Sequence, residues 1–69
     1  MSNVGKIAGE IWDYLHENGG ASTTFKLKMI LAIDVATLHF AIGWLLREDK
    51  VDIEKLDKGY KVFLKEPAL

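Results

Sequence analysis

The sequence has no cysteine and a single proline among its 69 residues. The lack of cysteine excludes disulfide bonds and the zinc sites that depend on thiolates. A domain of about this length has one hydrophobic core and buries only about 60% of the surface that its unfolded chain exposes. Because 49% of the residues are hydrophobic, some apolar surface remains for a partner. We therefore predict one domain, residues 1–69, that works as a homodimer.

Long hydrophobic runs and a strong excess of charge are also missing. No apolar run approaches the roughly 20 residues that a membrane helix needs, so we expect no membrane contact and a cytoplasmic location. Nine Lys and Arg against ten Asp and Glu give a net charge of −1. DNA-binding domains commonly have a pI above about 9, whereas the pI here is about 6.0. The overall charge therefore gives no support to DNA binding.

The residues needed for catalysis do not form a recognisable group. The only histidines, His16 and His39, fall on different predicted helices. Neither Ser2 nor Ser22 stands in a nucleophile-elbow motif, and the glycines match no phosphate-binding loop. We predict that the protein is not an enzyme, binds no metal or cofactor, and has no evident small-molecule ligand.

The first 18 residues have the pattern of an amphipathic helix. Ser2 or Asn3 would cap a helix over residues 3–18, and Gly19 or Gly20 would supply the left-handed conformation that ends it. The apolar residues that recur at three- and four-residue spacing are Val4, Ile7, Ala8, Ile11, Trp12 and Leu15.

Two further helices follow. Thr23 can cap a helix over residues 24–32, and Asp34 can cap another over residues 35–48. The inward residues of the second helix would be Leu27, Ile30 and Leu31. Only a residue or two around Ile33 would join the two helices, which is the tight junction of a helix-turn-helix.

After the third helix the hydrophobic period changes to two, which predicts a β-hairpin over about residues 51–66. Pro67 would mark its end because proline cannot donate to a strand ladder. We place the hairpin tip at Lys58 and Gly59. This tip gives two cross-strand pairs, Ile53 with Leu64 and Asp52 with Lys65.

Three helices followed by a hairpin give an α+β fold of the winged helix-turn-helix type. The run "AIGWLLREDKV", residues 41–51, resembles that of a family of short, functionally uncharacterised bacterial winged helix-turn-helix proteins. The resemblance covers essentially the whole chain. It implies the winged-helix DNA-binding-like superfamily, with the third helix as recognition helix and the hairpin as wing. It also implies a short strand at Ala21 and Ser22.

The third helix departs from that pattern on its outward side. At about 100° per residue, the core side would hold Val35, Leu38, Ala41, Ile42, Leu45 and Leu46. The opposite side would hold Ala36, Phe40, Gly43 and Arg47, flanked by Thr37, Trp44 and His39. Arg47 alone in the opposite arc is a base-reading type of residue, and it lies at the C-terminal end. Sequence-specific base reading is therefore poorly supported.

Two functional hypotheses follow. The first is weak, mainly phosphate-directed DNA binding in a transcription-associated role, which rests on analogy of fold. The residues proposed for it are Lys26, Lys28, Thr37, His39, Arg47, Lys58 and Lys61. The second is a protein-interaction or homodimerisation module that uses the apolar side of the third helix. Its residues are Ala36, Phe40, Gly43 and Trp44.

Plainer interpretations stay open for several of these residues. Lysines and acidic residues interleave along the hairpin, as in an ordinary solvated surface. Trp44 could fold under the wing against Tyr60 or Phe63 and belong to the core. His39 could be a partly exposed helix residue without a role.

Overall fold

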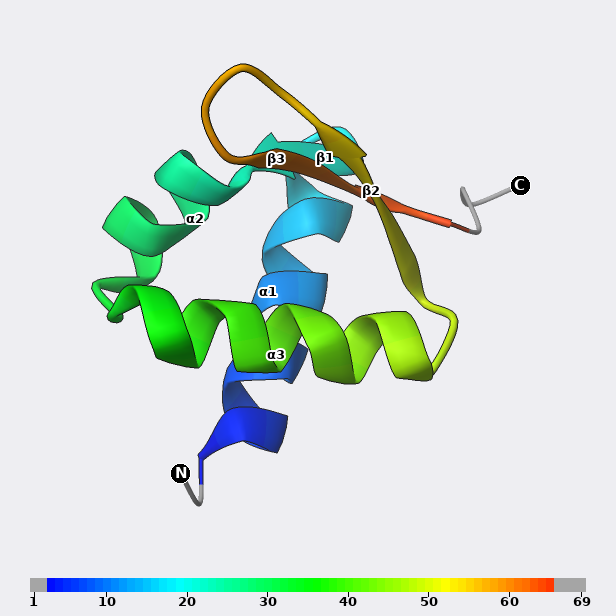
Figure 1. Ribbon diagram of the computed structural model, residues 1–69. Helices are drawn as coiled ribbons and strands as arrows, with labels where there is room; N and C mark the ends of the chain where they lie inside the picture. Colours follow the sequence, from blue (N-terminus) through cyan, green and yellow to red (C-terminus); the bar gives the residue numbers. More distant parts are fainter. Residues whose placement is uncertain (1–2, 66–69) are drawn as a thin grey trace.

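The computed structural model describes residues 3–65 and has the α+β winged helix-turn-helix fold (Figure 1). Its elements are α1 (Val4–Glu17), β1 (Ala21–Thr23), α2 (Thr24–Leu31), α3 (Val35–Arg47), β2 (Val51–Lys55) and β3 (Tyr60–Leu64). The helix bounds differ from the predicted ones by one residue at most, and the hairpin strands end at Leu64. The predictions made for Ser2, Glu66 and Pro67 lie outside the described residues.

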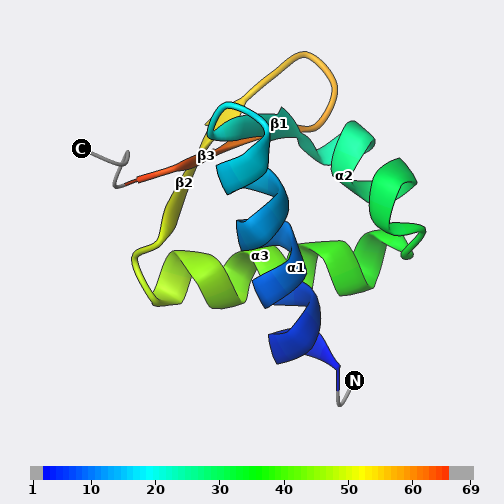
Figure 2. The same cartoon turned by 180° about the vertical axis from the view of Figure 1, so that it is seen from behind.

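The helices cross beneath a small sheet. α3 crosses in front of α1 in Figure 1, and α1 lies in front of α3 in the view from behind (Figure 2). The sheet is antiparallel with strand order β1-β3-β2, so β3 is the central strand. The short strand that the family resemblance implies at Ala21 and Ser22 is present as β1.

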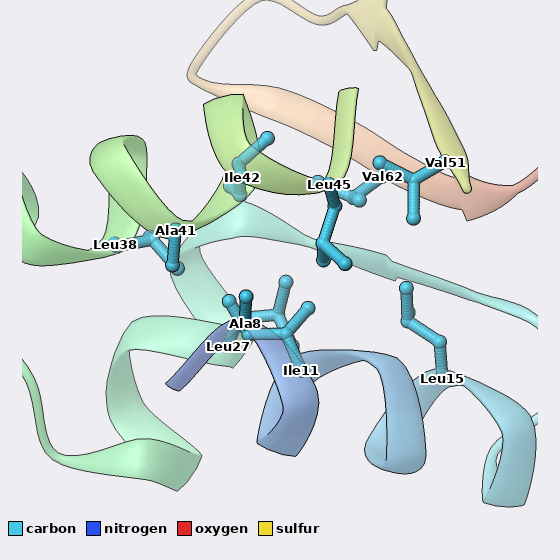
Figure 3. Close-up of a cluster of buried hydrophobic side chains, with 10 residues drawn as sticks. All are labelled: Ala8, Ile11, Leu15, Leu27, Leu38, Ala41, Ile42, Leu45, Val51 and Val62. Carbon is cyan, nitrogen blue, oxygen red and sulfur yellow. The ribbon is translucent and has the colours of Figure 1, made fainter. Parts of the chain in front are cut away.

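The core draws on all three helices and on the hairpin, and its side chains converge in Figure 3. The buried residues are Ala8, Ile11, Leu15, Leu27, Leu38, Ala41, Ile42, Leu45, Val51 and Val62. The predicted inward positions Ile30 and Val35 are wrong, since their side chains are 52% and 51% exposed. Ile30 points about 100° away from Leu31, off the inward side of an eight-residue helix. Val35 opens α3 and lines a surface groove.

The predicted caps of the second and third helices are confirmed. Thr23 Oγ1 accepts a hydrogen bond from the Lys26 amide at 3.1 Å. Asp34 Oδ2 accepts from the Thr37 amide at 3.2 Å, and the Thr37 hydroxyl donates to Asp34 Oδ1 at 2.6 Å. These bonds lower the pKa of Asp34 from its ordinary value of 3.8, because they favour the ionised carboxylate. At the start of α1, Asn3 takes the cap position without a side-chain cap bond.

The turns between helices use left-handed backbone. Gly19 and Gly20, with φ of 82° and 87°, end the α1 segment as predicted. The α2–α3 junction is slightly longer than predicted and runs from Ala32 to Asp34. Ala32 has φ of 54° there, and its amide donates to the carbonyl groups of α2.

The predicted register of the hairpin is wrong by two residues. Ile53 pairs with Val62 rather than Leu64, and Asp52 faces Phe63 rather than Lys65. The tip is a loop over residues 56–59, in which the Leu56 amide donates to the Gly59 carbonyl at 3.1 Å. The alternation along each strand fits either register, because a shift of two residues keeps every side chain on the same side of the sheet. The two registers differ only in the length of the loop that joins the strands.

Candidate interaction surfaces

A groove of about 300 Å³ lies between the start of α2, the first half of α3 and the wing tip. Phe25, Val35 and Leu38 contribute apolar walls. Lys28, His39 and Lys58 line the same groove from α2, α3 and the loop between β2 and β3. We call it the wing groove. It brings together three of the seven residues proposed for DNA binding, which are far apart in the sequence.

The wing tip is held over this groove by Thr24, a buried residue at the start of α2. Its Oγ1 accepts a hydrogen bond from the Tyr60 amide at 3.1 Å. The Leu64 amide, four residues further along β3, donates to the Gly20 carbonyl at 2.8 Å. β1 ends at Thr23, so its backbone cannot bond to Tyr60. The Thr24 hydroxyl takes its place as the acceptor and extends the hydrogen bonding between β1 and β3 by one bond.

Gly59 completes the contact between the wing tip and α2. Its φ is +78°, and a β-carbon built there would lie 2.6 Å from Thr24 Oγ1. Any larger residue would therefore push the loop away from α2. The position of neighbouring Lys58 depends on this contact. Sequence reasoning missed Thr24 because a threonine after a capping threonine resembles an ordinary first-turn residue.

The remaining residues proposed for DNA binding do not line the wing groove. Lys61 lines a separate hollow on the outer side of the sheet, beside Glu54 and His16. Arg47 ends α3, about 12 Å along the helix axis from His39. Thr37 donates its hydroxyl to the Asp34 carboxylate.

Lys26 and His39 are already partly engaged with their own helices. The Lys26 backbone amide is used by the cap of α2, while its side chain is exposed. His39 Nδ1 lies 2.9 Å from the Val35 carbonyl oxygen, to which it donates. Nδ1 therefore carries a proton, and Nε2 of the neutral ring is an acceptor.

A second surface runs along the outward side of α3. We call Ala36, Phe40, Gly43 and Arg47 the outer face of α3, and all four are exposed. Phe40 exposes 52% of its surface, which is large for an aromatic residue. Arg47 is the single charged member of this face.

Trp44 borders the outer face and does not fold under the wing. A β-carbon built on Gly5 would lie 3.2 Å from Cζ2 and Cη2 of the Trp44 ring. The ring edge therefore packs closely on α1 beside Gly5, where a β-carbon would make the ring shift slightly, while 47% of the residue stays exposed. Of the two interpretations left open for Trp44, packing under the wing against Tyr60 or Phe63 does not occur, because the ring lies on the side of α3 that faces α1.

Within residues 3–65, no three His, Asp or Glu side chains are grouped so that they could hold a metal ion. In the same range no single helix is long and apolar enough to cross a membrane. α2 and α3 reach that length only together, with a bend of 114° between them.

Comparison with known proteins relates the chain to winged helix-turn-helix domains. The model of a family described as "Winged helix-turn-helix domain (DUF2582)" matches residues 1–64. A protein of the archaeon Methanocaldococcus jannaschii, named "Uncharacterized protein MJ1608", is 35% identical over 65 residues, which is 90% of each chain. The resemblance predicted from the sequence is thereby confirmed for the fold family, and it extends beyond bacteria. No solved structure matches the chain.

Proposed function

This chain belongs to the family of winged helix-turn-helix domains described as DUF2582, and we propose that it is a non-enzymatic module that binds DNA weakly through phosphates. The main support for this proposal is the wing groove, which brings together Lys28, His39 and Lys58 from three different elements. In a winged helix, DNA contacts are expected at α3 and at the wing. Lys28 and Lys58 lie in the wing groove next to α3, where they could contact the phosphates of a bound duplex. We expect this binding to take place in the cytoplasm.

Phosphate contact fits these residues better than base reading does. A lysine side chain offers a point charge that needs no particular base edge. The outer face of α3, which would enter a major groove, carries an aromatic ring and two small residues, and its one forked donor, Arg47, lies at the C-terminal end of the helix. A transcription-associated role would then depend on a partner or on DNA shape for its specificity.

The test measures binding to a labelled mixed-sequence DNA duplex by fluorescence anisotropy over a range of salt concentrations. Each lost phosphate contact should reduce the slope of log K against log salt by about 0.9. We expect Lys28→Gln and Lys58→Gln each to have that effect. Lys6→Gln is the matched control, because Lys6 belongs to the first turn of α1. Figure 1 shows that this end of α1 lies away from the wing tip. Absence of binding at low salt, or equal slopes for all variants, would overturn the proposal.

Self-association is a second candidate function, and the exposed outer face of α3 supports it. Phe40 is an aromatic side chain of the kind enriched in protein interfaces, and its neighbours Ala36 and Gly43 allow another backbone to approach closely. High salt separates the two functions. It should weaken phosphate contacts steeply and leave an apolar contact almost unchanged.

A further inference from the structure

We infer that the outer face of α3 packs against the same face of a second copy of this chain, with the two helices antiparallel. The inference rests on the self-association proposed above and does not depend on DNA binding.

The outer face alternates small and large residues. Ala36, Phe40, Gly43 and Arg47 follow one another at spacings of four, three and four, which is the spacing of a helix–helix contact stripe. If a twofold axis passes between positions 41 and 42, Phe40 faces Gly43 of the second copy, and Ala36 faces its Arg47. Each large side chain then meets a small one in both directions, so this face is complementary to itself.

Charge favours the same alignment. Asp34 precedes Ala36 by two residues, about 3 Å along the axis, and its carboxylate is exposed at the start of α3. The antiparallel pairing brings Arg47 of one copy to the end of α3 that carries the exposed Asp34 in the other, at each end of the contact, where opposite charges attract. A parallel pairing would instead put Arg47 beside Arg47 and Phe40 against Phe40, with like charges adjacent.

The rest of the molecule leaves room for this partner. α1 packs behind α3, so the outward side of α3 faces the viewer without another element over it (Figure 1). The wing groove opens toward the hairpin, so a second copy on the outer face would leave Lys28 and Lys58 accessible. One pair of 13-residue helices is small beside a standard interface of about 800 Å² per partner. We therefore expect a dissociation constant on the order of micromolar.

The first measurement is the mass of the full chain by sedimentation velocity over a dilution series. We expect a dimer that dissociates on dilution, and a Phe40→Asp variant that stays monomeric throughout. Met29→Asp is the control, because Met29 is an exposed apolar residue of α2 that lies outside both the outer face and the wing groove. A wild-type monomer at every concentration would overturn both the self-association and this inference. A Phe40→Asp variant that still dimerises would overturn the inference alone.

The alignment is tested by cross-linking, which the lack of cysteine in this chain makes selective. Ala36→Cys and Arg47→Cys variants are prepared separately, mixed and mildly oxidised. We expect disulfide-linked dimers mainly in the mixture, because only the 36–47 pair comes within disulfide reach in the antiparallel arrangement. Efficient cross-linking of Ala36→Cys with itself would show a parallel pair and overturn the alignment, although self-association would stand.

Discussion

Gly59→Ala tests how the wing tip is held against α2. The backbone at Gly59 is left-handed, with φ of +78°, and the added methyl group would lie 2.6 Å from Thr24 Oγ1. That oxygen is the acceptor for the Tyr60 amide. The substitution therefore strains the backbone and displaces the acceptor of the central strand at the same time.

The magnitude follows from these two effects. An alanine in the left-handed region costs about 1 kcal/mol, and the partly buried Tyr60 amide left without its acceptor costs about 2 kcal/mol. The free energy of unfolding should fall by about 3 kcal/mol, which corresponds to roughly 12–24 °C in Tm for a domain of this size. Gly19→Ala is the control: its φ is +82°, but nothing lies within 4 Å of the added carbon. It should lose only about 1 kcal/mol.

The assay is thermal and denaturant unfolding followed by circular dichroism. A Thr24→Ala, Gly59→Ala double variant adds a second check, because removal of the hydroxyl also removes the steric conflict. We expect the double variant to be more stable than the sum of the two single losses implies. If Gly59→Ala and Gly19→Ala differ by less than about 0.5 kcal/mol, the contact with Thr24 does not hold the wing tip.

The remaining predictions concern the core and the cap of α3. Leu27→Ala should lower the free energy of unfolding by about 2–5 kcal/mol, because Leu27 is fully buried. Ile30→Ala should change it by less than about 0.5 kcal/mol, and equal losses would contradict the burial assigned to α2. Asp34→Asn tests the lowered pKa of this carboxyl, which the Thr37 hydroxyl and amide cause. Because the folded-state pKa is lowered, the ionised carboxyl stabilises the protein fully at pH values well above 3.8, and this stabilisation is lost progressively as the pH falls through the folded-state pKa. The Tm difference between wild type and Asp34→Asn should therefore shrink with acidification from about pH 5, and a constant difference would rule out the charged cap.

Local sequence determines much of this fold. Thr23 and Asp34 begin their helices by bonds to amides three residues away, and Gly19 and Gly20 end a helix through their own backbone freedom. These effects act within one helical turn, so the residue order suffices to predict them. The outer face of α3 is also determined by local sequence, because helical periodicity alone predicts which side chains lie together on the outward side.

Contacts between distant segments were decided only by the tertiary structure. The Thr24 hydroxyl and the Tyr60 amide are 36 residues apart, and no periodic pattern links them. The same holds for the Trp44 ring on Gly5 and for the meeting of Lys28, His39 and Lys58 in the wing groove. Alternation along the hairpin could not fix its register, because a two-residue shift preserves the sides of the sheet. The sequence alone thus determined which elements form and which sides are apolar, whereas the site depends on how those elements pack, since packing is a property of the whole chain.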